Sequence, residues 1–309
     1  MTTNESSSNF EDTPDRDPGK PGAIGVPSGI GHPLRPARAL IGWMPPGTGE
    51  QVLASSRMDI ALDEQQAKLQ KARDAVAARP AGIDQDGLVA DLPPLLADHV
   101  DRLRATPAGE QMFSGGWEVK IVDLDRVVAF QPFVFTDTAV QRVEVPDVDD
   151  LEAIAKLTLP TEHTAAIQVH HDQLTQTYVI RSPNPNLKVM GNLGAQAGPN
   201  GAPLFGFIVG ELPSFVQVIN VGGRYVLNDG YHRAFGLLSR GITRVPAFVR
   251  SIDTSDIAVP INMLPRGAWT GDRPPVLRDY HDDVLTETVY LPAAQKMVVI
   301  SATELALPS

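Results

Sequence analysis

The stretch FVQVINVGGRYVLNDG, residues 215–230, constrains the fold of this chain more than any other part of its sequence. Two apolar runs that suit β-strands flank Gly222 and Gly223, and a two-residue Gly-Gly connection is typical of the primed turns of tight hairpins. The return strand then meets an Asn-Asp-Gly sequence at 228–230, where each residue tolerates a turn and the glycine allows a positive φ or a close backbone approach. We therefore predict a β-hairpin that leads directly into a second turn.

A helix is predicted to follow this turn and to run to about Arg240, with Gly241 as the residue just past its end. Residues spaced at i, i+3, i+4 and i+7 predict its buried face: Tyr231, Ala234, Phe235 and Leu238. His232 and Arg233 lie outside this stripe. Core packing therefore does not account for them.

The first turn of this helix has the chemistry of an anion site. Its backbone N–H groups have no acceptor within the helix, and the helix dipole places partial positive charge there. The guanidinium of Arg233 matches phosphate oxygens, and His232 adds a further donor. The alternative is structural: Asn228 or Asp229 caps the helix, and the two basic side chains pair with nearby carboxylates.

Composition divides the whole chain into four regions. Residues 1–38 are rich in Ser, Pro, Gly and Asp and almost lack bulky apolar side chains, so we expect a disordered tail. Residues 39–114 are expected to form a mainly helical N-terminal segment. A strand-rich core is expected over 115–252, followed by a C-terminal extension over 253–309. The expected fold class is α+β.

Periodicity and turn residues predict further elements in these regions. The helices expected are 63–79, which begins with two acidic residues and ends before a proline, one within 92–107, and one within 147–160. Strands are expected within 117–135, 165–171 and 177–182. A Gly- and Pro-rich loop is expected between the two apolar runs of 187–209, and a hairpin around Pro292 and Ala293.

The formal net charge of -11 argues against a protein that coats nucleic acid, because phosphate binding needs a concentrated basic face. The absence of cysteine excludes disulfides, thiolate metal sites and thiol catalysis. The sequence shows neither a secretory signal nor an apolar run near the roughly 20 residues of a membrane helix. We therefore expect a cytoplasmic protein without a membrane partner.

Two other clusters hold metal-ligating residue types. In VHHDQ, His170 and Asp172 point to the same face of a strand and could share a metal or acid–base site; the alternative is a polar strand end. His281, Asp282 and Asp283 offer the same choice. We assign no metal ligand from the sequence.

The order of hairpin, DGYHR turn, amphipathic helix and Val-Pro strand resembles the ParB/sulfiredoxin superfamily. Members typically carry a DGxHR- or GxHR-like turn, a short helix and then a G-x-x-x-V-P strand. The residues here that match this pattern are Asp229, Gly230, His232, Arg233, Gly241, Val245 and Pro246. The match is good over about 215–250 and extends more weakly to about 115, with His163 to Pro203 as an insertion. The resemblance implies a mixed sheet with short helices.

The resemblance also implies a ligand. In the superfamily this turn binds nucleotide phosphates, which implies ATP or CTP with Mg²⁺ on the following residues: Gly230, Tyr231, His232 and Arg233. Asp229 would shape the turn or hold a metal ion. The implied catalytic residues are Asp229, His232 and Arg233, with Arg233 stabilising the charge of the transferred group.

Departures from the superfamily narrow the expected function. Sulfiredoxin chemistry needs a cysteine where this chain has Tyr231, so that activity is excluded. Chromosome-partitioning members carry an arginine-rich turn and a downstream DNA-binding helical domain, for which the sequence shows no pattern. Small-molecule kinases of the superfamily carry a similar turn. We therefore expect a nucleotide-phosphate-binding kinase (a transferase) or NTP hydrolase with a small-molecule substrate. The alternatives are a non-catalytic ligand-sensing or protein-interaction module and, from historical naming alone, a nuclease.

Overall fold

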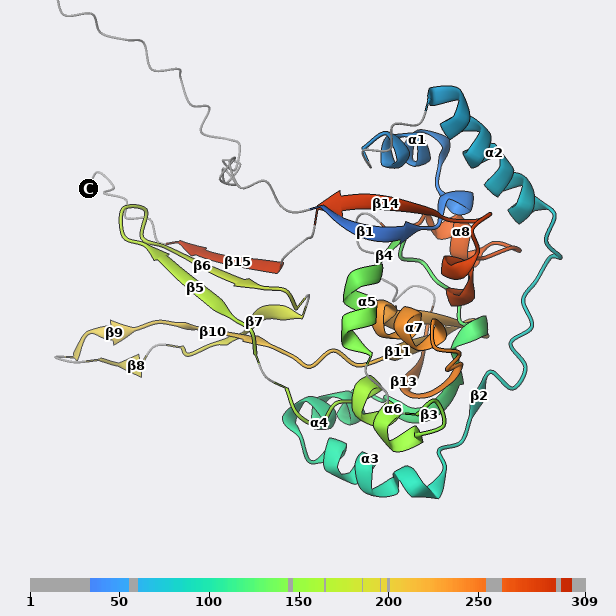
Figure 1. Cartoon of the computed structure of the whole chain (residues 1–309). Coiled ribbons are helices and arrows are strands. Elements are labelled where there is room, and N and C mark those ends of the chain that lie inside the picture. Colours follow the sequence, from blue (N-terminus) through green and yellow to red (C-terminus); the bar gives the residue numbers. More distant parts are fainter. Residues whose placement is uncertain are drawn as a thin grey trace, which may run out of the picture. The chain divides into compact units, whose positions relative to one another are not determined.

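The computed structural model describes residues 34–55, 61–143, 147–163, 165–184, 186–194, 196–198, 201–253, 263–292 and 296–301 (Figure 1). Helices and several separate sheets, both mixed and antiparallel, make up these residues, which confirms the α+β class. None of the helices in the described part of the chain is both long and apolar enough to cross a bilayer.

The main sheet has five strands in the order β12-β11-β13-β3-β2. Its strands are β2 (Val89–Ala90), β3 (Glu118–Asp123), β11 (Gln217–Val221), β12 (Arg224–Asp229) and β13 (Arg244–Ile252). The strands β11 and β12 form the predicted hairpin, in which Gly222 and Gly223 have φ values of 59° and 84°. These positive angles are those of a type I′ turn. β13 then runs parallel to β11 and antiparallel to β3.

The helix α7 (Tyr231–Leu238) follows the hairpin and packs on this sheet through its apolar face. Tyr231, Ala234 and Phe235 are buried as predicted, whereas Leu237 takes the fully buried position expected for Leu238, which is partly buried. The helix ends two residues earlier than predicted, because Gly241 at φ 78° turns the chain and the N–H of Ile242 donates to the carbonyl of Leu237.

Further helices contribute side chains to the core, among them α2 (Leu62–Ala77), α3 (Ala97–Arg104), α4 (Pro107–Ser114), α5 (Thr136–Arg142) and α6 (Leu151–Thr158). Their starts follow from local chemistry. The Asp150 carboxylate accepts the Ala153 N–H at the start of α6, and the Thr106 hydroxyl accepts the Gly109 N–H at the start of α4. The remaining helical segments are α1 (Pro46–Ser55), α8 (Arg266–Thr270) and the 3₁₀ turns η1 (Ile41–Trp43), η2 (Pro94–Leu96), η3 (Leu124–Arg126) and η6 (Leu277–His281).

A second sheet has the order β14-β1-β4, formed by β1 (Leu34–Ala39), β4 (Phe133–Phe135) and β14 (Glu287–Pro292). Its strand β1 lies within the predicted tail. Residues 1–33 of that tail lie outside the described residues, but residues 34–39 pair with β14, and residues 37–39 also pair with β4 and bury Ala37. The tail boundary predicted at residue 38 is therefore too late, because a strand can join a sheet through its backbone without a run of bulky apolar side chains.

The predicted hairpin around Pro292 is wrong. β14 pairs with β1, and β15 (Lys296–Ser301) pairs instead with β6 (Thr177–Ser182). The turn residues 293–295 lie outside the described residues. A proline-containing break predicts the end of a strand but not its partner, and each of these strands pairs with a strand far away in sequence.

Strands of the insertion pair with one another and with β10 and β15 in three small sheets. One has the order β15-β6-β5, where β5 is Gln168–Asp172. A two-stranded sheet pairs β7 (Leu187–Asn192) with β10 (Phe207–Glu211), and β8 (Gln196–Ala197) pairs with β9 (Pro203–Leu204) in the region predicted as a loop. Among the described residues, the main hydrophobic cluster takes no member from β5 to β10.

Candidate functional site

The turn between β12 and α7 consists of one residue. Gly230 has φ 98° and ψ 16°, a left-handed conformation that residues with a Cβ rarely adopt. A Cβ placed there would lie 3.0 Å from the Cα of Val216. The first hydrogen bond of the helix runs from the Ala234 N–H to the Gly230 carbonyl at 2.9 Å. The N–H groups of residues 231–233 therefore precede that bond, at the positive end of the helix dipole.

Asp229 secures this turn from the end of β12. Its Oδ1 accepts the N–H of Gly230 at 2.7 Å. Its Oδ2 accepts the hydroxyl of Ser214 at 3.2 Å and the amide of Asn186 at 3.4 Å. Burial raises the pKa of this carboxyl, and the hydrogen bonds and the nearby charge of Arg233 oppose that rise. Asp229 thus bonds the N–H of Gly230 rather than capping a later residue of the helix.

Arg233 turns toward the same place. Its Nη1 donates to the carbonyl of Ser214, and its charge lowers the pKa of Asp229. We call the group formed by Asn186, Ser214, Asp229, Gly230 and Arg233 the α7 corner. Asp229 and Arg233 therefore lie near each other at the start of α7.

His232 faces a different neighbour. Its ring stacks on Phe135 at the end of β4, with 6.0 Å between centroids and 7° between planes. The guanidinium carbon of Arg35 lies over the ring of the same phenylalanine, 5.6 Å from its centroid. The expectation that packing does not account for His232 is therefore wrong, because β4 supplies an aromatic partner from about a hundred residues earlier.

The side chain of Tyr231 is structural. Its hydroxyl donates to the Leu227 carbonyl at 2.8 Å and accepts the Phe130 N–H at 3.0 Å. Burial raises the pKa of this phenol. A ligand at the helix start can therefore meet the backbone of Tyr231 but not its hydroxyl.

Two members of the α7 corner were not predicted. Asn186 follows a proline-rich stretch of sequence in the insertion, and Ser214 lies just before β11. No motif in the sequence marks either residue. Their role depends on where the insertion returns to the core, which spacing along the chain does not reveal.

The residues of the two other clusters make contacts of their own, and the charge of His170 acts on Asp172. The Asp172 carboxylate accepts the N–H of Leu174 at 2.9 Å and thereby closes the β5–β6 turn. His281 stacks on Phe235 with 4.3 Å between centroids, while Asp283 pairs with Arg38 at 2.7 Å. No group of three or more His, Cys, Asp or Glu side chains able to hold a metal ion is found in the described part of the chain.

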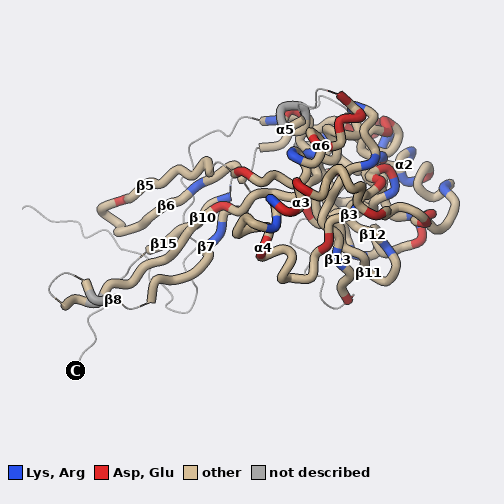
Figure 2. Tube along the Cα trace, turned by 90° about the horizontal axis from the view of Figure 1, so that it is seen from below, with Lys and Arg blue, Asp and Glu red and all other residues tan. Residues whose placement is uncertain are grey.

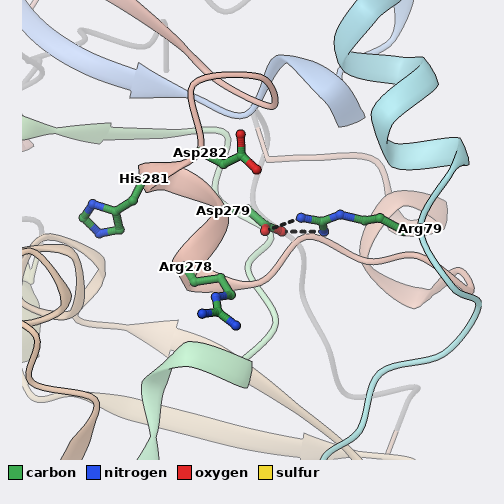
Figure 3. Close-up of a pocket in the computed structure, with 5 residues that line it drawn as sticks. All are labelled: Arg79, Arg278, Asp279, His281 and Asp282. Carbon is green, nitrogen blue, oxygen red and sulfur yellow. Dashed lines mark hydrogen bonds and ion pairs between the residues drawn. The ribbon is translucent and has the colours of Figure 1, made fainter.

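A separate pocket is lined by Arg79, Arg278, Asp279, His281 and Asp282 (Figure 3). Its most buried charge is already paired, because Asp279 accepts both terminal nitrogens of Arg79 and also the N–H of Val276. Figure 3 shows Arg278 and His281 pointing away from this ion pair. Burial, together with the charge of Arg38, lowers the pKa of His281. This arrangement joins the end of α2 to η6 and is structural.

Comparison of the chain with protein-family models, with curated proteins and with solved structures gives no significant match. The functional proposal therefore depends on the α7 corner and on the sequence resemblance.

Proposed function

We propose that the α7 corner binds the phosphate group of a nucleotide, ATP or CTP with Mg²⁺, and that the chain is a small-molecule kinase or NTP hydrolase of the ParB/sulfiredoxin superfamily. The observation that carries this proposal is the single left-handed residue, Gly230, between β12 and α7. This residue turns the chain so that the first N–H groups of α7, at the positive end of the helix dipole, face the place where the Arg233 guanidinium lies.

The order of elements supports the superfamily assignment. The hairpin β11–β12, the helix α7 and the parallel return strand β13 follow one another and lie in or on one sheet. β3, the strand of the weaker part of the resemblance, completes that sheet beside β13. The insertion of the resemblance corresponds to strands that contribute nothing to the main cluster in the described part of the chain.

The contacts of Arg233 suit exchange with a phosphate. In this structure its guanidinium donates to the neutral carbonyl of Ser214. A phosphate oxygen carries a negative charge that the Ser214 carbonyl lacks, so the charged guanidinium attracts it more strongly. A nucleotide phosphate placed before the helix would therefore compete with the carbonyl for this side chain, and the N–H groups of the first turn would bind the remaining oxygens.

Asp229 limits how a metal ion could be held. Each carboxylate oxygen accepts two hydrogen bonds, and Oδ2 already accepts two while Oδ1 accepts one. The carboxylate can therefore offer at most one further lone pair. Mg²⁺ in nucleotide sites keeps several waters and is bound by one or two carboxylates together with phosphate oxygens. Asp229 fits as one such ligand, and the metal would neutralise charge on the transferred phosphoryl group.

Calorimetric titration of ATP and CTP, each with and without Mg²⁺, tests this proposal. Wild type is expected to bind one of them. Arg233→Ala is expected to weaken binding about 10- to 100-fold, the size of a lost charge-assisted hydrogen bond. Arg240→Ala, which removes an exposed arginine beyond the end of the same helix, is the matched control and should bind as wild type does. If wild type binds neither nucleotide, or if both variants weaken binding equally, the assignment is wrong.

The second candidate function is a non-catalytic sensor of a phosphorylated ligand. It is favoured by the engagement of Asp229 with three donors, which leaves this carboxylate little capacity to act as a base. Turnover separates the two candidates. Release of phosphate, or transfer of a labelled γ-phosphoryl group to a small-molecule mixture, supports the enzyme, whereas nucleotide binding that depends on Arg233 without turnover supports the sensor.

A further inference from the structure

Two pockets lie next to each other where β3 begins, and Gly116 lines both of them. One, of about 530 Å³, lies at the end of β13 and is lined by Arg250 and Ser251. The other, of about 430 Å³, is lined by residues of β3, α3 and α4, which include Arg104 and Trp117 (Figure 1). Cavities of this size are typical of ligand sites. We call the two pockets together the Gly116 site.

Each pocket holds an arginine whose guanidinium lies over an aromatic ring. The guanidinium carbon of Arg104 is 3.8 Å from the ring centroid of Phe113, and that of Arg250 is 4.8 Å from the ring centroid of Trp117. Both rings meet Phe248 of the core edge-on, so their own positions are fixed. Stacking fixes the plane of a guanidinium while the N–H donors on its edge stay available for an anion.

The stacked arginines elsewhere in the described part of the chain already have an acidic partner. Arg35 pairs with Asp137 at 2.6 Å, and Arg79 pairs with Asp279. The two stacked arginines of the Gly116 site form no ion pair with any described residue, although the chain has a formal net charge of -11. Two guanidiniums that are held in place but not neutralised by their own chain are suited to an anion from outside it.

The acidic residues that line the site do not neutralise these arginines. The Nζ of Lys120 lies 3.4 Å from the carboxylate of Glu118 and donates to Asp91 at 3.2 Å. Asp253 lines the pocket of Arg250 but forms no ion pair with it. Figure 2 shows basic and acidic positions interspersed around α3 and α4. This region therefore lacks the concentrated basic face that a nucleic acid needs.

The backbone of β13 determines a second property of the ligand. The N–H of Phe248 donates to the Val216 carbonyl at 2.9 Å, toward β11, and backbone groups alternate from side to side along a strand. Ser251 therefore turns its N–H and C=O toward the other side, where β3 starts only at Glu118. No backbone hydrogen bond joins Ser251 to Gly116, which lies opposite it. An open length of strand edge is where an extended peptide adds to a sheet.

We propose that the Gly116 site binds an extended acidic peptide segment of a partner protein. The peptide backbone pairs with Ser251 in continuation of β3, and its carboxylates bond Arg104 and Arg250. Arg250 uses Nη1 for the Gly115 carbonyl, at 3.0 Å, and its Nη2 donors remain for a carboxylate. The strand edge selects an extended backbone, and the two guanidiniums select acidic side chains. This inference does not depend on nucleotide binding, because the Gly116 site and the α7 corner share no residue.

Fluorescence anisotropy of labelled short peptides, titrated with the full chain, tests the proposal. The peptide TEVEVET is acidic and favours an extended strand. TQVQVQT keeps the strand pattern without charge, and TEPEPET keeps the charge but loses backbone N–H groups and the regular strand conformation. Wild type is expected to bind TEVEVET at least about 10-fold more tightly than either control peptide, the size of one lost charge-assisted bond or of the backbone bonds.

Substitution of the arginines locates the binding. Arg104→Ala, at an exposed residue that folding does not require, is expected to weaken the binding of TEVEVET about 10-fold, and Arg250→Ala at least as much. Arg102→Ala is the matched control, because it removes the same charge from α3 at a residue that lines neither pocket. This variant should bind the peptide as wild type does.

The proposal is overturned if wild type fails to bind TEVEVET at about 1 mM, or if either control peptide binds equally well. Equal weakening by Arg102→Ala and Arg104→Ala would overturn it in favour of unspecific attraction. Binding of phosphatidylserine vesicles or single-stranded RNA that requires Arg104, without peptide binding, would overturn it in favour of a membrane or a nucleic acid. Loss of peptide binding in Arg233→Ala would move the peptide to the α7 corner, whereas peptide binding by a chain that binds no nucleotide supports the Gly116 site alone.

Discussion

At the α7 corner, polar side chains from three distant parts of the chain meet around one glycine, and nearly every side chain behind them is buried. Along the strands β7 to β10, which we call the β7–β10 ribbon, apolar side chains are exposed and no charged residue lies between Lys188 and Glu211. The corner therefore satisfies its polar groups inside one molecule, whereas the ribbon leaves apolar groups unsatisfied. The two regions therefore differ in what folding has already satisfied: the polar groups of the corner have partners, and the apolar side chains of the ribbon are exposed.

The test with the largest expected effect replaces one leucine in each region by alanine. Leu227 on β12 is fully buried, and Leu204 on β9 is half exposed. Leu227→Ala leaves a cavity and is expected to cost about 2–5 kcal/mol in the free energy of unfolding. Leu204→Ala is expected to change it by less than about 0.5 kcal/mol, because an exposed side chain loses little burial.

Urea denaturation at a single low protein concentration measures both values, so that association between molecules does not enter the comparison. Equal losses in the two variants would mean that the ribbon packs against the core of its own chain, and the contrast between the regions would disappear.

A smaller effect is expected for glycine substitutions. They separate two reasons for glycine at position 230, its left-handed backbone and its close contact with Val216. Gly230→Ala requires a left-handed alanine and also brings its Cβ to 3.0 Å from Val216. Gly223→Ala in the hairpin turn requires a similar φ, 84°, but meets no atom within 4 Å. We expect a cost of about 1 kcal/mol at the hairpin, from the backbone alone, and about 2–3 kcal/mol at the corner.

Thermal unfolding of both variants measures the difference. A matching loss at the two positions would show that Val216 moves aside, and that the close approach of β11 to the turn does not set the geometry of the corner. Nucleotide binding by Gly230→Ala, if retained at full strength, would also argue against a precisely placed helix start.

Local chemistry predicted the hairpin, the Gly230 turn and the buried face of α7, because each depends on residues within one or two turns of one another. It did not predict the partners of β14 and β15, nor that Phe135 stacks on His232, because these contacts join segments far apart in sequence. At the α7 corner the residues of the motif were identified, but Asn186 and Ser214 were not. Two strands of the insertion were predicted from their sequence pattern. Which strands they pair with, and therefore which of their side chains are exposed, does not follow from periodicity.

The smallest effect, and the most specific, is the pH dependence of Asp229 compared with Asp172 of the insertion. Burial raises the pKa of Asp229, so its contribution to stability is complete below the unfolded value of about 3.9 and decreases as the pH rises through the folded-state pKa. Hydrogen bonds from Thr175 and Leu174 lower the pKa of Asp172, so its contribution is present above about 3.9 and is lost as the pH falls.

Asp229→Asn is therefore expected to become more stable relative to wild type as the pH rises from 4 to 7. Asp172→Asn is expected to be less stable than wild type above about pH 4, by a difference that shrinks as the pH falls below that value. Urea unfolding of the three proteins at each pH gives these differences, in which the titration of all other groups cancels. If Asp229→Asn instead loses stability as the pH rises, the hydrogen bonds and Arg233 outweigh burial. The carboxylate would then be held charged at the corner, and a phosphate beside it would face a full negative charge that only Arg233, the helix dipole or a metal ion could offset.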